Sequence, residues 1–292
     1  MDDVHIGVLG GSGLYAMEGL SNLEERVVST PFGDTSAPFA VGELEGRRVA
    51  FLARHGLGHR LSPSEINYRA NIFAFKLLGA ERLISISAVG SMQEDYHPTD
   101  IVVPDQFVDR TRHRPDTFFG DGLVAHVSMA DPICEELRLH LLEAARGAGA
   151  RAHDGDTYLC MEGPQFSTRA ESLIYRQWGA DVIGMTNLQE AKLAREAEMS
   201  YATLAMVTDF DCWHEDEDDV EVSDVLEVLR SNAHLAQDVV RRVVASLDID
   251  RPSPWAGSLR TAIITDPSVV PEATKERLAP IVGRYLVDDR SA

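Results

Sequence analysis

The sequence predicts an α/β fold organised as a single domain. Short apolar runs rich in valine, isoleucine and leucine alternate along the chain with longer stretches whose apolar residues recur at helical spacing. The apolar runs show little polar alternation, which is typical of strands buried on both faces of a sheet. Nothing before residue 247 has the composition of a linker, so we expect 1–247 to form one domain.

Six apolar segments are predicted to be strands, and distinctive turns follow several of them. In chain order the segments are 4–9, 48–52, 82–86, 101–103, 181–183 and 202–207. The first runs into the glycine-rich turn 10–13, and Arg54 and His55 follow the second almost directly. Ligands of open α/β sheets bind at the carboxyl ends of strands, so these turns are the first candidates for a site.

Amphipathic stretches between the strands predict the helices. The predicted helices cover 64–78, 170–178, 190–197 and 223–246. Ser64 is the expected N-cap of the first helix. A proline-rich break near 250–254 ends the pattern. The C-terminal extension 248–292, with one short helix near 272–278, is expected to pack on the domain or on a neighbouring subunit.

Composition restricts the possible partners. The 292 residues carry a formal net charge of −20, and lysine and arginine are not clustered. Nucleic acids and anionic membrane surfaces attract clustered positive charge, so we expect neither as a partner. An anionic substrate therefore needs a site that concentrates cations and backbone N–H groups locally.

Three observations bear on location. No apolar run of about 20 residues occurs, so we expect no membrane-spanning helix. The chain begins Met1-Asp2-Asp3, with acid where an export signal carries base. The three cysteines are odd in number and widely scattered, which favours a reducing compartment over disulfides or a zinc site. We therefore expect a cytoplasmic protein.

Three strand-end turns have the chemistry of an anion site. The turn 10–13 can direct backbone N–H groups at a phosphate, Arg54 supplies a cation, and 87–91 adds a hydroxyl among small residues. Each alone also fits an ordinary turn, but together they favour a composite anion site. A dinucleotide fingerprint is the alternative for the first turn, but its glycine spacing differs and no strand-end acid follows at the required distance.

Two acids follow the predicted strand 202–207. Asp209 and Asp211 flank Phe210, and they point to the same side if the strand continues. Neighbouring carboxylates tend to raise one pKa, which yields a proton donor near neutrality. A divalent metal is the competing interpretation, but no further ligand falls at suitable spacing, so we expect no metal. Phe166, in a turn before a predicted helix, is either core or a stacking partner for a heterocycle.

Nine segments carry a resemblance to a known family. In chain order they are GGSGL 10–14, TPFG 30–33, ARHG 53–56, NYRAN 67–71, AVGS 88–91, DQF 105–107, EGPQF 162–166, GMT 184–186 and TDFDCW 208–213. Together they resemble the purine nucleoside phosphorylase family, in its 5'-methylthioadenosine phosphorylase branch. The resemblance implies a mixed central sheet flanked by helices, assembled as a homotrimer. It also implies phosphorolysis of methylthioadenosine to adenine and 5-methylthioribose 1-phosphate, with no metal or organic cofactor.

The same resemblance implies roles for individual residues. Asp209 and Asp211 match catalytic carboxylates that read the 6-amino group and N7 of the purine. The matched phosphate contacts are Ser12, Arg54, His55, Ser87, Ala88 and Thr186, and the matched nucleoside contacts are Phe166, Ser167, Met185, Val222, Val225, Leu226 and His126. The three aliphatic residues of the second set match a wall for the 5'-methylthio group. His126 matches a residue that reaches the site from the neighbouring subunit.

Base selectivity follows from the charge of the two acids. A carboxylate accepts a hydrogen bond from a 6-amino group but repels a 6-carbonyl oxygen, so Asp209 and Asp211 favour adenine. The 6-oxopurine branch of the family carries an asparagine in this region.

Three alternatives stay open on sequence: a phosphorylase for 6-oxopurine nucleosides or methylthioinosine, a nucleotide-binding oxidoreductase, and a non-catalytic regulatory relative.

Overall fold

The computed structural model describes residues 4–11, 19–214, 228 and 232–286. Its strands form one 11-stranded sheet. The strands are β1 (Ile6–Gly10), β2 (Ser21–Arg26), β3 (Phe39–Leu44), β4 (Arg47–Ala53), β5 (Arg82–Ser91), β6 (Ile101–Val103), β7 (Gln106–Arg110), β8 (Ala152–Asp154), β9 (Thr157–Met161), β10 (Val182–Gly184) and β11 (Ser200–Asp209). Parallel and antiparallel pairs both occur, which confirms the α/β fold with a mixed central sheet.

Strand β5 is the centre of the sheet. On one side β11 runs parallel to it along nearly its whole length, from Arg82 to Gly90. On the other side β1 pairs with it in parallel only as far as Ser85, and antiparallel β10 begins its pairing at Gly90. Among the described strands, 86–89 therefore has no partner on that side. Such a point, where neighbouring strands diverge, is where α/β sheets bind ligands.

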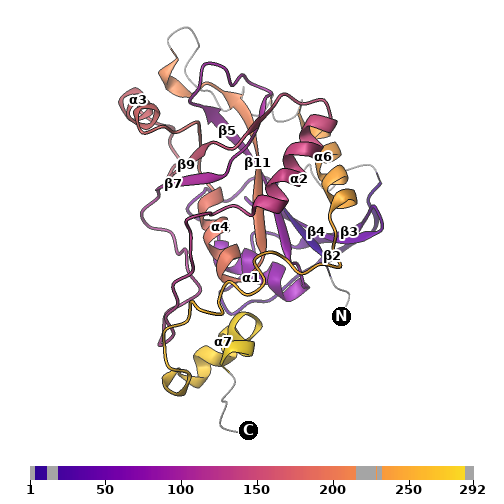
Figure 1. The fold of residues 1–292 in the computed structure, drawn as a ribbon, viewed down its shortest axis with the longest axis vertical. Coiled ribbons are helices and arrows are strands. Elements are labelled where there is room, and N and C mark those ends of the chain that lie inside the picture. Colours follow the sequence, from indigo (N-terminus) through magenta and orange to yellow (C-terminus); the bar gives the residue numbers. More distant parts are fainter. Residues whose placement is uncertain (1–3, 12–18, 215–227, 229–231, 287–292) are drawn as a thin grey trace.

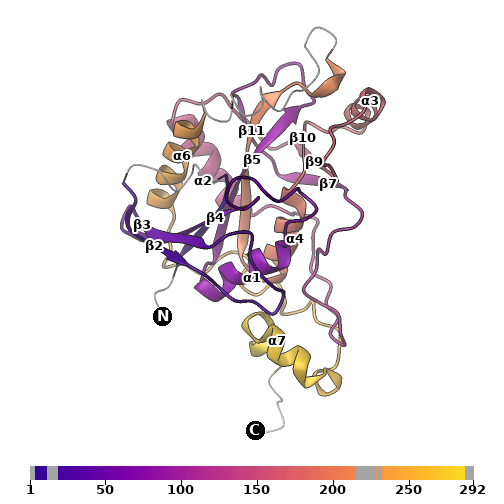
Figure 2. The same ribbon diagram turned by 180° about the vertical axis from the view of Figure 1, so that it is seen from behind.

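Helices cover both faces of the sheet (Figures 1 and 2). They are α1 (Tyr68–Leu78), α2 (Glu135–Gly147), α3 (Arg169–Gln177), α4 (Asn187–Glu196), α6 (Ala233–Ser246) and α7 (Glu272–Val282). α2 packs against α6, α1 packs against α4, and both α2 and α4 contact β11. α2 lies in front of the sheet in Figure 1, and α1 lies in front of it in Figure 2, which shows the molecule from behind. The two helices therefore cover opposite faces. β11 is buried along almost its entire length, in keeping with the mostly apolar run 202–207 at its centre.

The predicted start of the first helix is wrong. α1 begins at Tyr68, and its N-cap is Asn67, whose side chain accepts from the Ala70 N–H at 3.1 Å. The Ser64 hydroxyl instead donates to Glu162 at 2.8 Å, because the residues around it form a separate turn. Ser64 therefore tethers this turn to a distant segment and does not cap a helix.

Other boundaries differ less. α3 begins one residue before the predicted 170, behind a capping box formed by Thr168 and Glu171. α4 begins at Asn187 and not at 190. α6 begins at Ala233, and most of the predicted helical segment before it lies outside the described residues.

Six elements were not predicted, namely β2, β3, β7, β8, β9 and α2. β2 is polar and exposed along nearly its whole length, so it carries no burial signal. The sequence of α2 does carry a burial signal, because Leu137 and Leu141 lie one turn apart on its buried face. Its charged outer face, with Glu135 and Glu136 in the first turn, completes an amphipathic helix.

The C-terminal segment 248–286 packs on the same apolar core as the rest of the chain. Trp255, Leu259 and Val282 belong to the main buried cluster. Arg82, buried at the start of β5, donates to the Asp248 backbone oxygen at 3.1 Å. α7 lies at one end of the molecule (Figure 1). The domain boundary at 247 stays a prediction.

None of the described helices is long and apolar enough to cross a membrane.

Candidate active site

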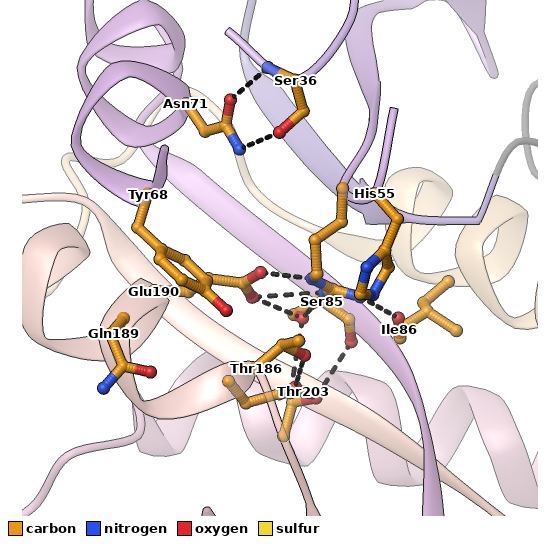
Figure 3. Close-up of polar contacts among 12 residues, drawn as sticks. Ser36, His55, Tyr68, Asn71, Ser85, Ile86, Thr186, Gln189, Glu190 and Thr203 are labelled. Atoms are coloured by element: carbon orange, nitrogen blue, oxygen red, sulfur yellow. Dashed lines mark hydrogen bonds and ion pairs between the residues drawn. The ribbon is translucent and has the colours of Figure 1, made fainter. Parts of the chain in front are cut away.

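The predicted anion site is centred on Arg54, which follows β4. Its backbone N–H donates to Gly10 O at the end of β1. Its buried guanidinium donates to Ile86 O at 2.9 Å and to Ser85 Oγ at 2.5 Å, and it forms an ion pair with Glu190 of α4 (Figure 3). Burial lowers the pKa of Arg54, but the Glu190 carboxylate outweighs that effect and raises the pKa above its ordinary value. The guanidinium therefore stays charged.

His55 lies next to Arg54 with its ring held in one orientation. Its Nδ1 is 2.8 Å from the Leu61 carbonyl oxygen, so Nδ1 carries a hydrogen. The ring also stacks on His59, with centroids 4.1 Å apart. Burial and the Arg54 charge lower the pKa of His55 to about 4. At neutral pH the ring is uncharged, and Nε2 is a hydrogen-bond acceptor.

Ser87 and Ala88 occupy the part of β5 that lacks a described strand partner toward β1 and β10. The Ser87 hydroxyl is buried and has no hydrogen-bond partner within the described ranges. The Ser87 hydroxyl lies close to the Tyr158 phenol, but the two groups are not in hydrogen-bond geometry. Burial raises the pKa of Tyr158, and the nearby Ser87 hydroxyl partly lowers it. A buried hydroxyl of this kind is a position where a ligand oxygen can supply the missing partner.

The N-terminus of α4 is the fourth component. Thr186 is its N-cap and is buried, but its hydroxyl contacts Asn187 Oδ1 at 3.1 Å and does not cap the helix. The N–H groups of a first turn and the helix dipole favour an anion at such an end. Glu190, one turn further along α4, holds Arg54, so the helix end and the cation are joined.

A turn between β9 and α3 carries Phe166 and Ser167. Phe166 is 42% exposed, which excludes the core alternative and leaves its ring available to a ligand. Gly163 has φ +65°, and a Cβ there would lie 2.5 Å from Met185 Sδ, so glycine allows the turn to approach Met185. The Ser167 carbonyl accepts from the Cys212 thiol at 3.2 Å, which ties the turn to the segment of the two acids.

Arg114 holds these segments together, and it was not predicted. Its buried guanidinium donates to the backbone oxygens of Met185 and Glu162, and to Gln189 Oε1 at 3.1 Å. It also lies over the ring of Tyr68, 5.7 Å from the centroid. In the sequence it belongs to a run of arginine and histidine that resembles an exposed basic segment. Nothing in that run distinguishes the buried arginine from the others.

The two acids are adjacent, but not in the way that strand alternation predicts. Asp209 is the last residue of β11, whereas Asp211 begins the 3-10 turn η1 (Asp211–Trp213) with φ +48°. Asp209 accepts from the Thr208 hydroxyl at 2.7 Å and from the Asp211 backbone N–H at 2.9 Å. Asp211 accepts from the Ser172 hydroxyl at 2.5 Å. The chain turn, and not the pleat, therefore sets their relative position.

Both carboxyls have raised pKa values. Burial raises the pKa of Asp209 against the opposing hydrogen bonds from Thr208 and Asp211. Burial, and then the charge of Asp209, raise the pKa of Asp211. A carboxyl that keeps its proton closer to neutral pH is suited to general-acid catalysis.

The acids and the predicted anion site both lie beside β5. Asp209 is level with Gly90 of β5, three residues beyond Ser87, which corresponds to roughly 10 Å of strand. A Cβ at Gly90 would lie 2.9 Å from Asp209 Oδ1, so the acid is packed directly on the strand. One end of the arrangement thus has the chemistry to bind an anion and the other has the chemistry to donate a proton, and the small residues of β5 lie between them. This suits a ligand in which an anion meets a heterocyclic leaving group.

Some predicted residues are not joined to this cluster. His126 is exposed, and its backbone N–H donates to Ala262 O at 2.9 Å. Four others, Ser12, Val222, Val225 and Leu226, lie outside the described residues. Within the described part of the chain, no group of three or more His, Cys, Asp or Glu side chains could hold a metal ion.

The chain is similar to known proteins over nearly its whole length. Residues 5–245 match the model of the phosphorylase superfamily. S-methyl-5'-thioadenosine phosphorylase from Chloroflexus aurantiacus is 59% identical over 98% of this chain and 99% of its own length. The enzyme of that name from Koribacter versatilis is 57% identical over 98% of both chains. These alignments include most of the C-terminal extension.

Solved structures show the same relationship. A methylthioadenosine phosphorylase from an Antarctic soil metagenomic library superimposes with a TM-score of 0.92 at 50% identity, covering 96% of this chain and 99% of the other. A mutant of adenosine/methylthioadenosine phosphorylase from Schistosoma mansoni, in complex with methylthioadenosine, gives 0.81 at 36% identity, covering 89% and 99%. The chain therefore belongs to the phosphorylase superfamily and, within it, to the S-methyl-5'-thioadenosine phosphorylase family.

Proposed function

We propose that this chain cleaves 5'-methylthioadenosine with inorganic phosphate, releasing adenine and 5-methylthioribose 1-phosphate. The observation that carries the proposal is the position of Asp209, a carboxyl with a raised pKa. Asp209 pairs with Gly90 of β5, the strand whose residues Ser85 and Ile86 accept hydrogen bonds from Arg54. The names of the relatives at 57% and 59% identity support the choice of substrate.

Arg54, His55, Ser87, Ala88 and Thr186 are proposed to hold phosphate. A phosphate oxygen attacks C1' of the ribose as the bond to N9 breaks, and the bonding electrons leave with the purine. The sugar is cationic in the transition state, so the nearby phosphate charge stabilises it. Binding both reactants side by side also removes most of the entropic cost of bringing them together. Ser12 is proposed to complete this set.

Asp209 is proposed to donate its proton to N7 of the departing purine. Protonation neutralises the charge that develops on the base, and it leaves a carboxylate that recovers a proton from solvent before the next cycle. Asp211 is proposed to accept from the 6-amino group, which disfavours 6-oxopurines. Phe166 is proposed to stack on the purine, with Ser167 and Met185 beside the nucleoside. No metal or organic cofactor enters this chemistry, and phosphate is the co-substrate.

We further propose a cytoplasmic homotrimer that serves purine and methionine salvage. Exposed His126 is proposed to reach the site of a neighbouring subunit, and Val222, Val225 and Leu226 to contact the 5'-methylthio group. An apolar wall of this kind favours a thioether over a hydroxyl by roughly 1–3 kcal/mol. We do not expect nucleic acid or membrane partners.

The test is adenine release from methylthioadenosine with and without phosphate. Adenosine, inosine and methylthioinosine are compared at equal concentration. We expect release that requires phosphate, with methylthioadenosine preferred. Rapid release without phosphate would show a hydrolase, and a preference for methylthioinosine or inosine would show a 6-oxopurine phosphorylase.

A further inference from the structure

Glu190 is a buried glutamate of α4 that the proposed mechanism does not use. Its side chain is 1% exposed, and that of Arg54 is 4% exposed. One carboxylate oxygen accepts from Arg54 Nε. The other accepts from Arg54 Nη2 at 3.2 Å, from the Ser85 hydroxyl at 2.8 Å and from the Tyr201 hydroxyl at 2.9 Å. The carboxylate is thus held from three directions, and Figure 3 shows it between α4 and the sheet.

These contacts account for nearly all the hydrogen-bond capacity of Arg54. A guanidinium has five N–H groups. Nε donates to Glu190, Nη2 donates to Glu190 and to Ser85 Oγ, and Nη1 donates once, to Ile86 O. Within the described residues, one N–H remains without a partner, on Nη1. Glu190 and Arg54 meet edge to edge, through Nε and Nη2, which fixes the plane of the guanidinium.

The same contacts connect Arg54 to the helix end. Thr186 and Glu190 are four residues apart, so they lie on the same face of the first turns of α4. A shift of α4 would therefore move Thr186 and Arg54 together. The ion pair is also neutral overall, so Arg54 attracts an anion through a directed N–H more than through net charge.

We propose that Glu190 is a positioning residue of the phosphate site, which orients Arg54 so that a single Nη1 N–H is presented to phosphate. The inference rests on the proposed function and deepens it. It predicts that losing the Glu190 charge weakens phosphate binding, even though the site becomes more positive. If Arg54 acted as a simple point charge, the same loss would strengthen phosphate binding.

The test compares Glu190→Gln with Glu196→Gln, a matched control on the same helix. Glu196 is also a buried glutamate, but its carboxylate accepts from Thr117 Oγ1 and the Phe118 N–H, both at 2.7 Å, and contacts none of the anion-site residues in the described structure. Initial rates are measured against phosphate at saturating methylthioadenosine, and against methylthioadenosine at saturating phosphate. Thermal unfolding checks that each variant is folded.

We expect Glu190→Gln to raise the phosphate KM by about 10-fold or more, the scale of a lost charge-assisted hydrogen bond. The methylthioadenosine KM should change by less than about 3-fold, and Glu196→Gln should leave both constants near the parent values. An unchanged or lower phosphate KM in folded Glu190→Gln would overturn the inference. Should that variant fail to fold, Tyr201→Phe decides the question, because it removes one donor to Glu190 and keeps the ion pair. A small rise in phosphate KM supports the inference, and no rise overturns it.

A second comparison separates positioning from a general structural role. In an Arg54→Lys background, no guanidinium remains to be oriented. Glu190→Gln should then raise the phosphate KM no further, whereas an undiminished effect would show that Glu190 acts by another route. A failure of the proposed function would be seen in a different measurement, because the parent enzyme itself would then release adenine without phosphate.

Discussion

Asp209→Asn is the substitution that isolates proton donation from the rest of the site. The amide has nearly the same shape as the carboxyl, and its oxygen can still accept from the Asp211 N–H. The NH₂ group would face the Thr208 hydroxyl, which can turn to donate to Val89 O at 3.2 Å and accept from the amide. The local hydrogen bonds therefore survive, so we expect the fold and the melting temperature to change little.

The loss should fall on the chemical step. An amide at this position cannot release a proton to N7, and a positioned general acid contributes about 10² to 10⁴-fold to rate. We expect kcat for methylthioadenosine to fall by at least about 10²-fold, equivalent to about 2.7 kcal/mol of transition-state stabilisation. The phosphate KM should stay close to that of the parent, because Asp209 pairs with Gly90, which is three residues along β5 from Ser87.

A substrate with a better leaving group makes the assay specific. An electron-poor purine, such as the 2-fluoro analogue, needs less help from a proton donor, so Asp209→Asn should slow it less than it slows methylthioadenosine. Adenine release is followed at saturating phosphate for both substrates, and unfolding is followed by circular dichroism. Turnover of methylthioadenosine within about 3-fold of the parent, by folded Asp209→Asn, would refute the assignment of the general acid.

Three further substitutions test other parts of the structure. Asp211→Asn removes a charge that repels a 6-carbonyl oxygen, so the kcat/KM ratio of methylthioadenosine to methylthioinosine should fall by about 10-fold; an unchanged ratio would assign base selection elsewhere. Arg114→Met leaves the Met185 and Glu162 backbone oxygens without their buried donor, so urea unfolding should show a loss of about 3–5 kcal/mol. A loss below about 0.5 kcal/mol would show that the contacts are unimportant. Burial raises the pKa of Glu196 from 4.5 to about 7. The protonated side chain therefore contributes fully to stability below pH 4.5, and this contribution is lost as the pH rises to about 7. Glu196→Gln should therefore be more stable than the parent at pH 8, by roughly 3 kcal/mol at most, and similar at pH 4; equal stability at pH 8 would contradict the raised pKa.

The fold class and the buried strands were predictable because they depend on local apolar runs. β6 is apolar throughout, and residues 202–207 of β11 are apolar except for one threonine; burial on both faces of the sheet follows from that pattern. β2 could not be found in the same way, because it is exposed and is held by pairing with β3. Ser64 failed as a helix cap because a good capping residue is equally suited to a turn, and the contact with Glu162 is distant in sequence.

Within the site, residues that follow strands were easier to predict than residues that support them. Arg54, His55 and Asp209 stand next to apolar runs, where a polar residue is conspicuous. Glu190 and Arg114 are also buried, but they lie in a helix and in a basic run, where charged residues usually face solvent. Their partners come from segments far along the chain, so sequence spacing carries no sign of them. A charged residue four positions after Thr186 was the one local hint for Glu190.

The charge arrangement of the site shows how the proposed phosphate site is compatible with a net charge of −20. At physiological salt the field of distant carboxylates is screened within about 8 Å, so short-range contacts decide binding. Those contacts carry little net charge here, because Arg54 is paired with Glu190, and burial and the Arg54 charge lower the pKa of His55 to about 4. Directed groups remain, namely the Nη1 N–H, the Ser87 hydroxyl and the end of α4. Since His55 Nε2 is an acceptor, it pairs best with an oxyanion that keeps a proton, as phosphate does at neutral pH and sulfate does not. Hydrogen-bond direction, more than positive charge, thus provides both the affinity and the selectivity of the proposed phosphate site.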